Sequence, residues 1–157
     1  MFKSKKDNNT ELFAPVTGKA VSLTSVPDPV FAEKMMGEGL AFVPESNVFS
    51  APADGTITMI SPTNHAYGMT LPSGLEVLVH IGIDTVKLDG EGFQLFVKEG
   101  QKVKKGQKVI EADLDFIRSK DIPTITPMIL LNHFDFKINE IIDNEDVNSG
   151  SVVVRYE

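Results

Sequence analysis

The chain has 157 residues, the size of one ordinary domain, and it contains no cysteine. The absence of cysteine excludes a disulfide scaffold, a thiolate metal site and a cysteine nucleophile. The formal net charge is −7, so a surface that grips nucleic acid is not expected, and a protein partner with a basic docking face fits better.

The predicted elements are short and mostly extended. Residues 1–10 are polar and are expected to form a flexible tail, followed by a single domain over 11–157. Period-two patterns between Gly, Pro, Asn and Asp predict strands at 19–23, 39–44, 55–60, 66–70, 75–83, 93–97, 109–113, 125–131, 136–142 and 152–156. Helical turns are expected at 29–36, where Asp28 is a candidate N-cap, and at 113–120. The predicted fold is an all-β, antiparallel β-sandwich of the barrel-sandwich type with a few short helical turns.

One predicted hairpin carries a histidine near each of its two ends. If Pro72 and Ser73 form a two-residue turn, facing residues have numbers that sum to 145, which places His65 directly opposite His80. Alternation puts these two rings on the outer face together with Leu78 and Tyr67. The core face takes the branched residues Val77, Val79, Ile81 and Ile83.

The residues alone leave two interpretations of this pair open. Histidines in strands are often structural, with their hydrogen bonds satisfied, whereas two adjacent imidazoles on an outer face suit a functional site. The pair supplies only two of the three or four ligands of a zinc site, and neither a Gly-x-Ser-x-Gly elbow nor a complete phosphate loop occurs. An imidazole nucleophile beside a hydrogen-bonding imidazole remains, and it suits phosphoryl transfer. His133 lacks a partner in the sequence and is expected to be incidental.

Five motifs carry a resemblance to a known family. They are VPDPVFAEKMMGEG at 26–39, AP-x-x-GT at 51–56, TNHA at 63–66, VHIGIDTV at 79–86 and GEGF at 90–93. In this order and spacing the chain resembles the glucose-family enzyme IIA of the bacterial phosphoenolpyruvate-dependent sugar phosphotransferase system, over about residues 12–156.

The resemblance implies a phosphocarrier and assigns a role to each residue of the pair. His80 would accept a phosphoryl group on Nε2 from the phosphorylated carrier protein HPr and pass it to a cysteine of the enzyme IIB domain of a sugar permease. His65 would donate a hydrogen bond in the transition state, and Thr63 would orient His65. The Nδ1 atom of His80 is expected to donate to a backbone carbonyl, with Gly82 as the candidate. No cofactor is required, although His65 and His80 would bind zinc where a partner supplies a carboxylate.

The expected partner-binding surface surrounds the pair. Apolar side chains would exclude water and fit two different partners, and acidic side chains would meet basic groups of a partner. The residues assigned to this surface are Asp28, Val30, Phe31, Met35, Met36, Tyr67, Leu78, Asp84 and Val86. Regulated metabolic enzymes or permeases are further possible partners. The chain shows no secretory segment and no apolar run of about 20 residues, so a cytoplasmic location is expected, with transient contact at the inner membrane face through the permease.

Two other functions remain as alternatives. A regulatory protein-binding module would keep the fold without turnover. A biotinyl or lipoyl carrier domain would share glycine-containing hairpins such as 100–109, but the lysine motif that such domains modify is missing. The sugar cannot be read from this chain, because the sugar site would lie on the permease.

Overall fold

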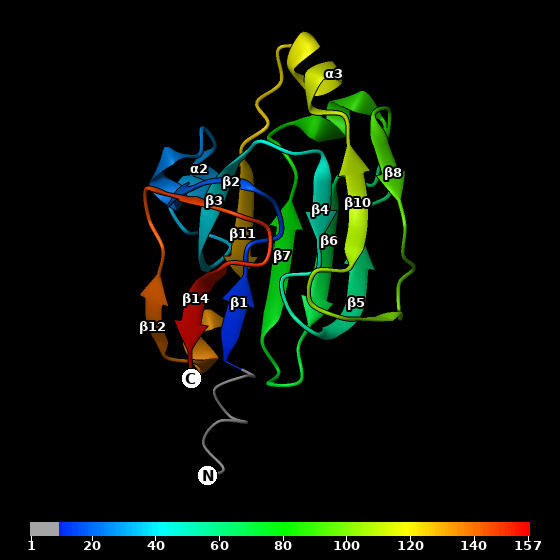
Figure 1. Cartoon of the computed structure of the whole chain (residues 1–157). Helices are drawn as coiled ribbons and strands as arrows, with labels where there is room; N and C mark the ends of the chain where they lie inside the picture. Colours follow the sequence, from blue (N-terminus) through cyan, green and yellow to red (C-terminus); the bar gives the residue numbers. More distant parts are fainter. Residues whose placement is uncertain (1–9) are drawn as a thin grey trace.

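The structure, a computed structural model, describes residues 10–157, and every strand pairing within them is antiparallel (Figure 1). The largest sheet has the strand order β13-β2-β3-β11-β7-β6-β5-β9. Its strands are β2 (Gly18–Ser22), β3 (Glu38–Pro44), β5 (Gly55–Ile60), β6 (Ala66–Thr70), β7 (Glu76–His80), β9 (Lys102–Val103), β11 (Thr126–Leu130) and β13 (Glu145–Val147).

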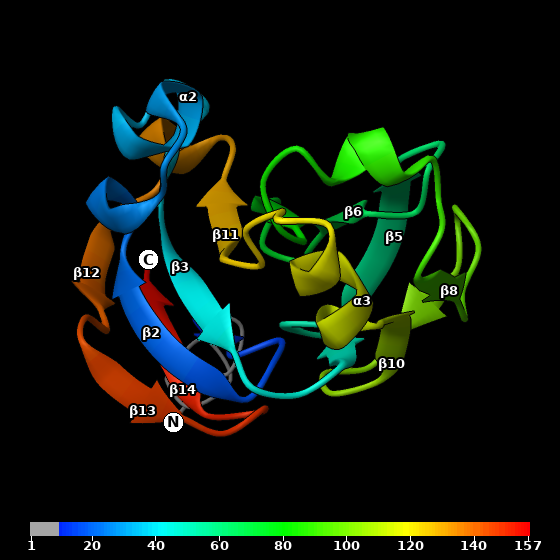
Figure 2. The ribbon, with the colours of Figure 1, turned by 90° about the horizontal axis from the view of Figure 1, so that it is seen from above.

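Two smaller sheets pack against the largest one. The first has the order β1-β14-β12 and consists of β1 (Glu11–Phe13), β14 (Val152–Tyr156) and β12 (Ile138–Ile141). The second has the order β4-β10-β8 and consists of β4 (Val48–Ser50), β10 (Lys108–Ala112) and β8 (Phe93–Leu95). Seen from above, β2 and β3 lie on one side of the molecule and β5 and β10 on the other (Figure 2).

The main core draws side chains from all three sheets. Phe42 of β3, Phe49 of β4 and Tyr156 of β14 belong to one buried apolar cluster and are almost completely inaccessible. Burying aromatic side chains of this size is the main favourable contribution to such a fold. This arrangement confirms the predicted all-β sandwich.

A second, smaller apolar cluster covers the outer side of the central strands. Leu78 of β7 and Ile129 of β11 face each other across the sheet, and Phe31 packs against the same cluster. Phe31 comes from α2 (Pro29–Ala32), which follows the 3-10 helix η1 (Leu23–Ser25). The outer face of this sheet is therefore partly covered by apolar side chains. These side chains pack beneath the elements that carry the histidines.

The helical turns are close to their predicted positions but shorter. Asp28 caps α2 by accepting a hydrogen bond from the Val30 N–H, and the helix ends before Lys34, whose φ is 59°. The second predicted turn is α3 (Leu114–Ser119), which Asp113 caps. Two further 3-10 helices are η2 (Thr85–Leu88) and η3 (His133–Asp135). No helix within residues 10–157 has the length and apolar character needed to cross a bilayer.

Both ends of the described chain lie at one end of the molecule (Figure 1). β1 pairs with β14, and the Thr10 carbonyl accepts a hydrogen bond from the Tyr156 N–H. The hydroxyl of Tyr156 in turn lies 2.8 Å from that of Ser73, at the tip of the β6–β7 hairpin. Residues 1–9 of the predicted tail lie outside the described residues. Thr10, the last residue of that tail, is hydrogen-bonded to β14.

Candidate functional site

The β6–β7 hairpin has a different register from the predicted one. Ala66, and not His65, lies opposite His80, and Tyr67 lies opposite Val79, so facing residues have numbers that sum to 146. The prediction of directly opposed histidines is therefore wrong by one residue.

The cause of the shift is the turn. The Leu71 N–H donates to the Leu75 carbonyl across a three-residue loop, and the last loop residue, Gly74, has φ 93°. A glycine in the left-handed region is typical of three-residue hairpin loops, whereas a two-residue turn was expected here. One extra loop residue moves every side chain of β6 to the other face. Tyr67 consequently points into the main core, where its hydroxyl donates to the Ser50 carbonyl.

The two imidazoles are nevertheless neighbours, as predicted. Their ring centroids are 4.9 Å apart with an interplanar angle of 77°. His65 lies just before β6, after Asn64 with φ 59°, and its carbonyl accepts a hydrogen bond from the Ile81 N–H. At this position strand alternation no longer fixes the direction of a side chain, and the ring reaches His80 from outside the regular strand.

A backbone carbonyl holds the ring of His80. Its Nδ1 lies 2.7 Å from the carbonyl oxygen of Gly82, as predicted. A carbonyl can only accept, so Nδ1 carries the proton and donates it, which leaves Nε2 with a free lone pair in the neutral ring. The ring of Phe31 packs against that of His80 at a tilt of 52°, with centroids 5.3 Å apart.

The turn after β7 fixes the direction of the Gly82 carbonyl. Gly82 has φ 74°, and a Cβ at this position would lie 2.6 Å from Cγ2 of Thr85 and 2.8 Å from the carbonyl oxygen of Pro123. Thr85 is fully buried, and its hydroxyl donates to the Ile81 carbonyl. The turn therefore requires glycine, and the buried threonine locks it.

Hydroxyl groups surround the ring of His65. Thr63 Oγ1 lies 2.7 Å from Nδ1 of His65, which agrees with the orienting contact expected for Thr63. Ser61 Oγ lies 3.3 Å from the same nitrogen, and Phe93 packs edge-on against the ring at 6.5 Å. The sequence interpretation missed Ser61 and Phe93. Ser61 starts the turn that leads to His65, and this polar position just before a Pro in the turn was the available signal.

Both rings are held in their neutral forms. Burial, and secondly the charge that His80 would carry, lower the pKa of His65 from 6.5 to about 4. Burial also lowers the pKa of His80, while the Gly82 carbonyl and the carboxylates of Asp28 and Asp84 act in the opposite direction. A neutral ring keeps a nucleophilic nitrogen at neutral pH.

Part of the predicted partner-binding surface is exposed. Val30, Met35, Met36 and Val86 present apolar side chains to solvent, with Met35 69% and Val86 56% exposed. Asp84 is also exposed, and Asp28, the cap of α2, is half-buried.

Three of the predicted surface residues are not available to a partner. Tyr67 belongs to the core because of the register shift, and Leu78 is 5% exposed and part of the second apolar cluster. Phe31 is also buried, although its ring touches His80. Of the predicted core residues, Val77, Val79 and Ile81 lie in the main core, whereas Ile83 joins the second cluster.

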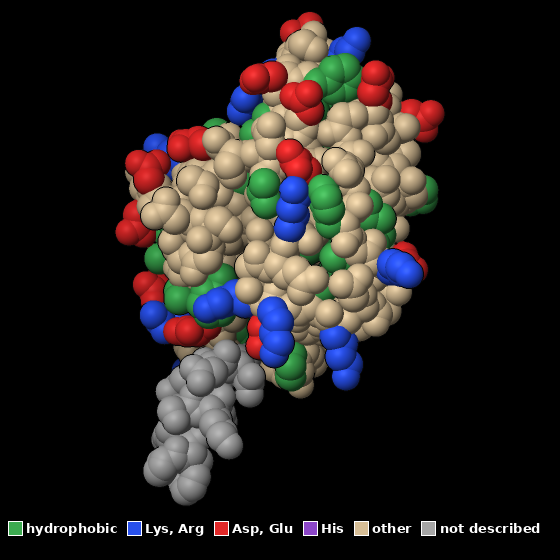
Figure 3. Space-filling view, turned by 45° about the vertical axis from the view of Figure 1, so that its right-hand side comes forward, with side chains coloured by type: hydrophobic (Ala, Val, Ile, Leu, Met, Phe, Trp, Pro, Cys, Tyr) green, Lys and Arg blue, Asp and Glu red, His purple; other side chains and the backbone are tan. Residues whose placement is uncertain are grey.

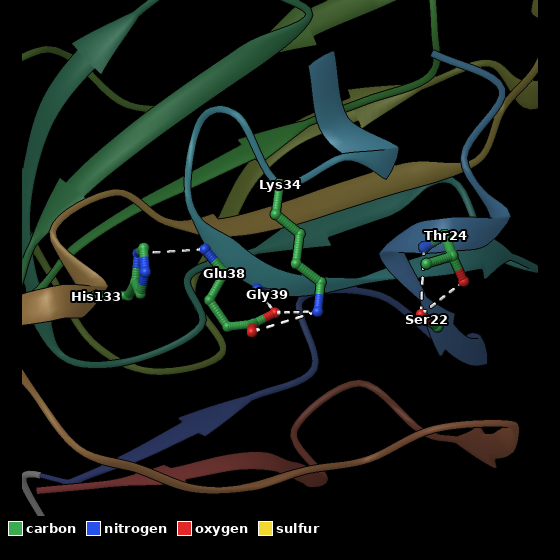
Figure 4. Close-up of polar contacts among 6 residues, drawn as sticks. All are labelled: Ser22, Thr24, Lys34, Glu38, Gly39 and His133. Carbon is green, nitrogen blue, oxygen red and sulfur yellow. Dashed lines mark hydrogen bonds and ion pairs between the residues drawn. The ribbon is translucent and has the colours of Figure 1, made fainter. Parts of the chain in front are cut away.

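His133 lies apart from the pair. Its Nδ1 accepts a 3.4 Å hydrogen bond from the Glu38 N–H, beside the ion pair between Lys34 and Glu38 (Figure 4). This contact supports a structural role, as expected for a histidine without a partner in the sequence.

The histidine pair is partly enclosed, since His65 is 8% exposed and His80 is half-buried. A cavity of about 670 Å³ is found at the other end of the β6–β7 hairpin, lined by residues such as Asp54, Leu71 and Lys102. No histidine is visible on the face in Figure 3, where Lys and Arg gather below and Asp and Glu above. The exposed apolar side chains on and just after α2, whose Phe31 contacts His80, suit a protein partner.

Metal ligands are few around the pair. Residues 10–157 contain no group of three or more His, Asp or Glu side chains placed to hold a metal ion. Both Nδ1 atoms take part in hydrogen bonds, so the pair offers only the two Nε2 atoms as ligands. Two nitrogens do not complete a zinc site.

Comparison with known proteins places this site in a family. Residues 10–136 match the family model described as phosphoenolpyruvate-dependent sugar phosphotransferase system, EIIA 1. Glucose permease IIA from Mycoplasma capricolum has a similar structure, with a TM-score of 0.85 and 39% identity over 92% of this chain and 93% of that one.

Two curated relatives are much longer than this chain. The glucose-specific EIICBA component of Staphylococcus saprophyticus is 42% identical over 96% of this chain, and the mannose-specific EIIBCA component of Corynebacterium glutamicum is 44% identical over 92%. The matched regions cover 22% and 21% of the relatives, so the chain spans about a fifth of their length. The chain belongs to the EIIA 1 family of the phosphoenolpyruvate-dependent sugar phosphotransferase system, and it is a phosphotransferase component of that system.

Proposed function

We propose that His80 carries a phosphoryl group between two proteins during sugar uptake. The donor is phosphorylated HPr, and the acceptor is a cysteine on the enzyme IIB domain of a permease. The relatives named EIICBA and EIIBCA support a IIB partner, because each name indicates a single protein that contains both a B and an A component. The exchange takes place on the cytoplasmic side, where a permease holds its IIB domain at the inner face of the membrane.

The observation that carries this proposal is the hydrogen bond between Nδ1 of His80 and the Gly82 carbonyl. It leaves the Nε2 lone pair free to attack the phosphorus of the donor phosphohistidine. A P–N bond to Nε2 forms as the donor's P–N bond breaks. In the second step a cysteine thiolate attacks the same phosphorus, and the P–N bond electrons return to Nε2.

His65 and the two carboxylates assist by charge. The Nε2–H of His65 donates to a phosphoryl oxygen, and this stabilises the charge that spreads over these oxygens in the transition state. Asp28 and Asp84 favour the positive charge that the His80 ring takes on when Nε2 forms its bond. They also repel the phosphoryl oxygens, and this favours onward transfer.

The exposed apolar rim supplies the docking surface. Val30 lies on α2, Met35 and Met36 follow this helix, and Val86 lies on η2, just after β7. Methionine adapts to partners of different shape. Water excluded by a docked partner cannot hydrolyse the phosphohistidine. The scheme needs no cofactor. A zinc ion would bind the two Nε2 atoms only with further ligands, such as a carboxylate from a partner.

The test is phosphorylation with phosphoenolpyruvate, enzyme I and HPr. The wild-type protein should gain one acid-labile phosphate, and His80→Gln should gain none. His133→Gln is the matched control, and it should be phosphorylated like the wild type. Phosphorylation of His80→Gln at the wild-type level would overturn the assignment, and a folded wild-type protein that accepts no phosphate would favour a purely regulatory module.

A further inference from the structure

Ser61 is the residue that organises the turn before His65. Its Oγ accepts hydrogen bonds from two backbone N–H groups, those of His65 at 3.0 Å and Ala66 at 3.1 Å. Its own N–H donates to the Ala66 carbonyl, and its carbonyl accepts from the Asn64 N–H. The same Oγ lies 3.3 Å from Nδ1 of His65.

These contacts leave Ser61 only one role toward the ring. A serine oxygen has two acceptor lone pairs and one proton. The two backbone N–H groups occupy both lone pairs, so toward Nδ1 of His65 the hydroxyl can act only as a donor. If Nδ1 carried a proton, that proton would face an oxygen with no acceptor capacity left.

Thr63 is closer to the ring, but it cannot select the proton position alone. Its Oγ1 has no hydrogen-bond partner within residues 10–157 other than Nδ1 of His65, at 2.7 Å. A free hydroxyl can donate to a bare nitrogen or accept from an N–H with equal ease. Thr63 therefore holds the ring in either tautomer, and only Ser61 distinguishes between them.

We propose that Ser61 is a positioning residue that fixes His65 in the tautomer with the proton on Nε2. This tautomer leaves a hydrogen-bond donor on Nε2 of His65, and the ring centroid of His80, whose own Nε2 carries a lone pair, is 4.9 Å from that of His65. The neighbouring rings thus carry opposite groups on Nε2, an acceptor on His80 and a donor on His65. The catalytic consequence rests on the proposed phosphoryl transfer, whereas the tautomer itself does not.

The direct test is the ¹⁵N spectrum of the imidazole rings in the unphosphorylated protein. In the wild type, the His65 signals should show a bare Nδ1 and a protonated Nε2. Ser61→Asp keeps an acceptor for the two backbone N–H groups but provides no proton, so it should move the proton to Nδ1. Ser61→Thr keeps the hydroxyl and should preserve the wild-type pattern.

Transfer to the IIB domain is the second measurement. We expect Ser61→Asp to slow onward transfer about 100-fold, the usual effect of losing one transition-state donor. Ser61→Ala should slow it only about tenfold, because water can partly replace the hydroxyl. Ser61→Thr should restore transfer. The matched control is Ser73→Ala, which removes a serine hydroxyl at the far end of the same hairpin and should change neither measurement.

The outcomes separate the two proposals. A bare Nδ1 in folded Ser61→Asp, or a wild-type tautomer pattern and wild-type transfer in Ser61→Ala, would overturn the role of Ser61. If the wild type accepts no phosphate but its His65 has the expected tautomer, then the proposed function fails and the tautomer assignment stands. Ser61→Ala and Ser61→Thr keep the test decisive if Ser61→Asp does not fold.

Discussion

The two turns that hold the histidines work by different means. The turn after β7 fixes His80 through a main-chain acceptor, the Gly82 carbonyl, whereas the turn before β6 holds His65 through the side chains of Thr63 and Ser61. A carbonyl accepts only, so it dictates the proton position on its ring. A hydroxyl can act in both directions and needs further contacts to become selective.

This difference shows how one residue type can serve two chemical roles. The nucleophilic nitrogen of His80 is set by a backbone carbonyl, and the side chains of the turn act on it only through the backbone. The orientation of His65 as a donor depends on the side chains of Thr63 and Ser61, which can be substituted one at a time. We therefore expect substitutions in the turn after β7 to lower the stability of the fold. Substitutions in the turn before β6 should mainly slow phosphoryl transfer.

Gly82→Ala should disrupt the turn after β7 and cause the largest loss of stability. The new Cβ would lie within 3 Å of Cγ2 of the buried Thr85 and of the Pro123 carbonyl oxygen, in a backbone region that disfavours alanine. We expect a loss of about 2–4 kcal/mol in the free energy of unfolding, measured by urea denaturation, and strongly reduced phosphorylation.

Gly74→Ala provides the matched control. Gly74 also has a positive φ, but a Cβ there meets nothing within 4 Å. It should cost only about 1 kcal/mol, because conformational strain acts without a steric clash. Equal losses in the two variants would show that the Gly82 turn is not sterically special.

His65→Gln should separate the two steps of transfer. His80 keeps its Gly82 contact, so the variant should still accept phosphate. Onward transfer to the IIB domain should fall about 100-fold, because the ring that donates to the phosphoryl oxygens is lost. Rapid-quench measurement of each step checks this, and unchanged onward transfer would refute the role of His65.

Thr63→Val should have a smaller effect on the same step. Valine has the shape of threonine but lacks the hydroxyl 2.7 Å from Nδ1, so the ring keeps its place and loses its nearest hydrogen bond. We expect onward transfer about tenfold slower, which corresponds to one ordinary hydrogen bond. A loss as large as that of His65→Gln would mean that Thr63, and not Ser61, sets the tautomer.

Acid should destabilise the protein through the histidine pair. The pKa of His65 is lowered to about 4 from 6.5, so the unfolded chain binds this proton more readily than the native protein. Stability is complete above pH 6.5 and falls as the pH drops toward 4, by about 1 kcal/mol from His65 between pH 7 and pH 5.5. Urea denaturation of the wild type and His65→Gln at both pH values measures this. An equal pH dependence in both would contradict the shift.

The sequence predicted several strands of five or six residues at their observed bounds. The 55–60, 66–70 and 152–156 strands have the predicted bounds. It missed β1, β4, β9 and β13, which have two or three residues each and form only because a partner strand is in place. The predicted 75–83 strand ends at His80, because Gly82 adopts a positive φ that no strand allows.

Two contacts of the site were predicted correctly, but the register of its hairpin was not. The residues gave the pairing of the rings and the Gly82 acceptor, but the loop length was read as two residues and is three. Tyr67 was therefore placed on the wrong face. The sequence marks Ser61 only as a polar residue before a Pro, because its role depends on three hydrogen bonds that converge only in the folded turn.

The pairing of β1 with β14 has a consequence for any longer protein that contains a domain of this fold. Both strands emerge beside the hairpin tip, while the imidazoles lie where β7 ends, at the opposite pole. A linker joined to either terminus would hold the domain at the end opposite the histidines. The end that carries the histidines would then be free to reorient. Such a mounting lets a single tethered carrier meet its donor and its acceptor in turn without detaching.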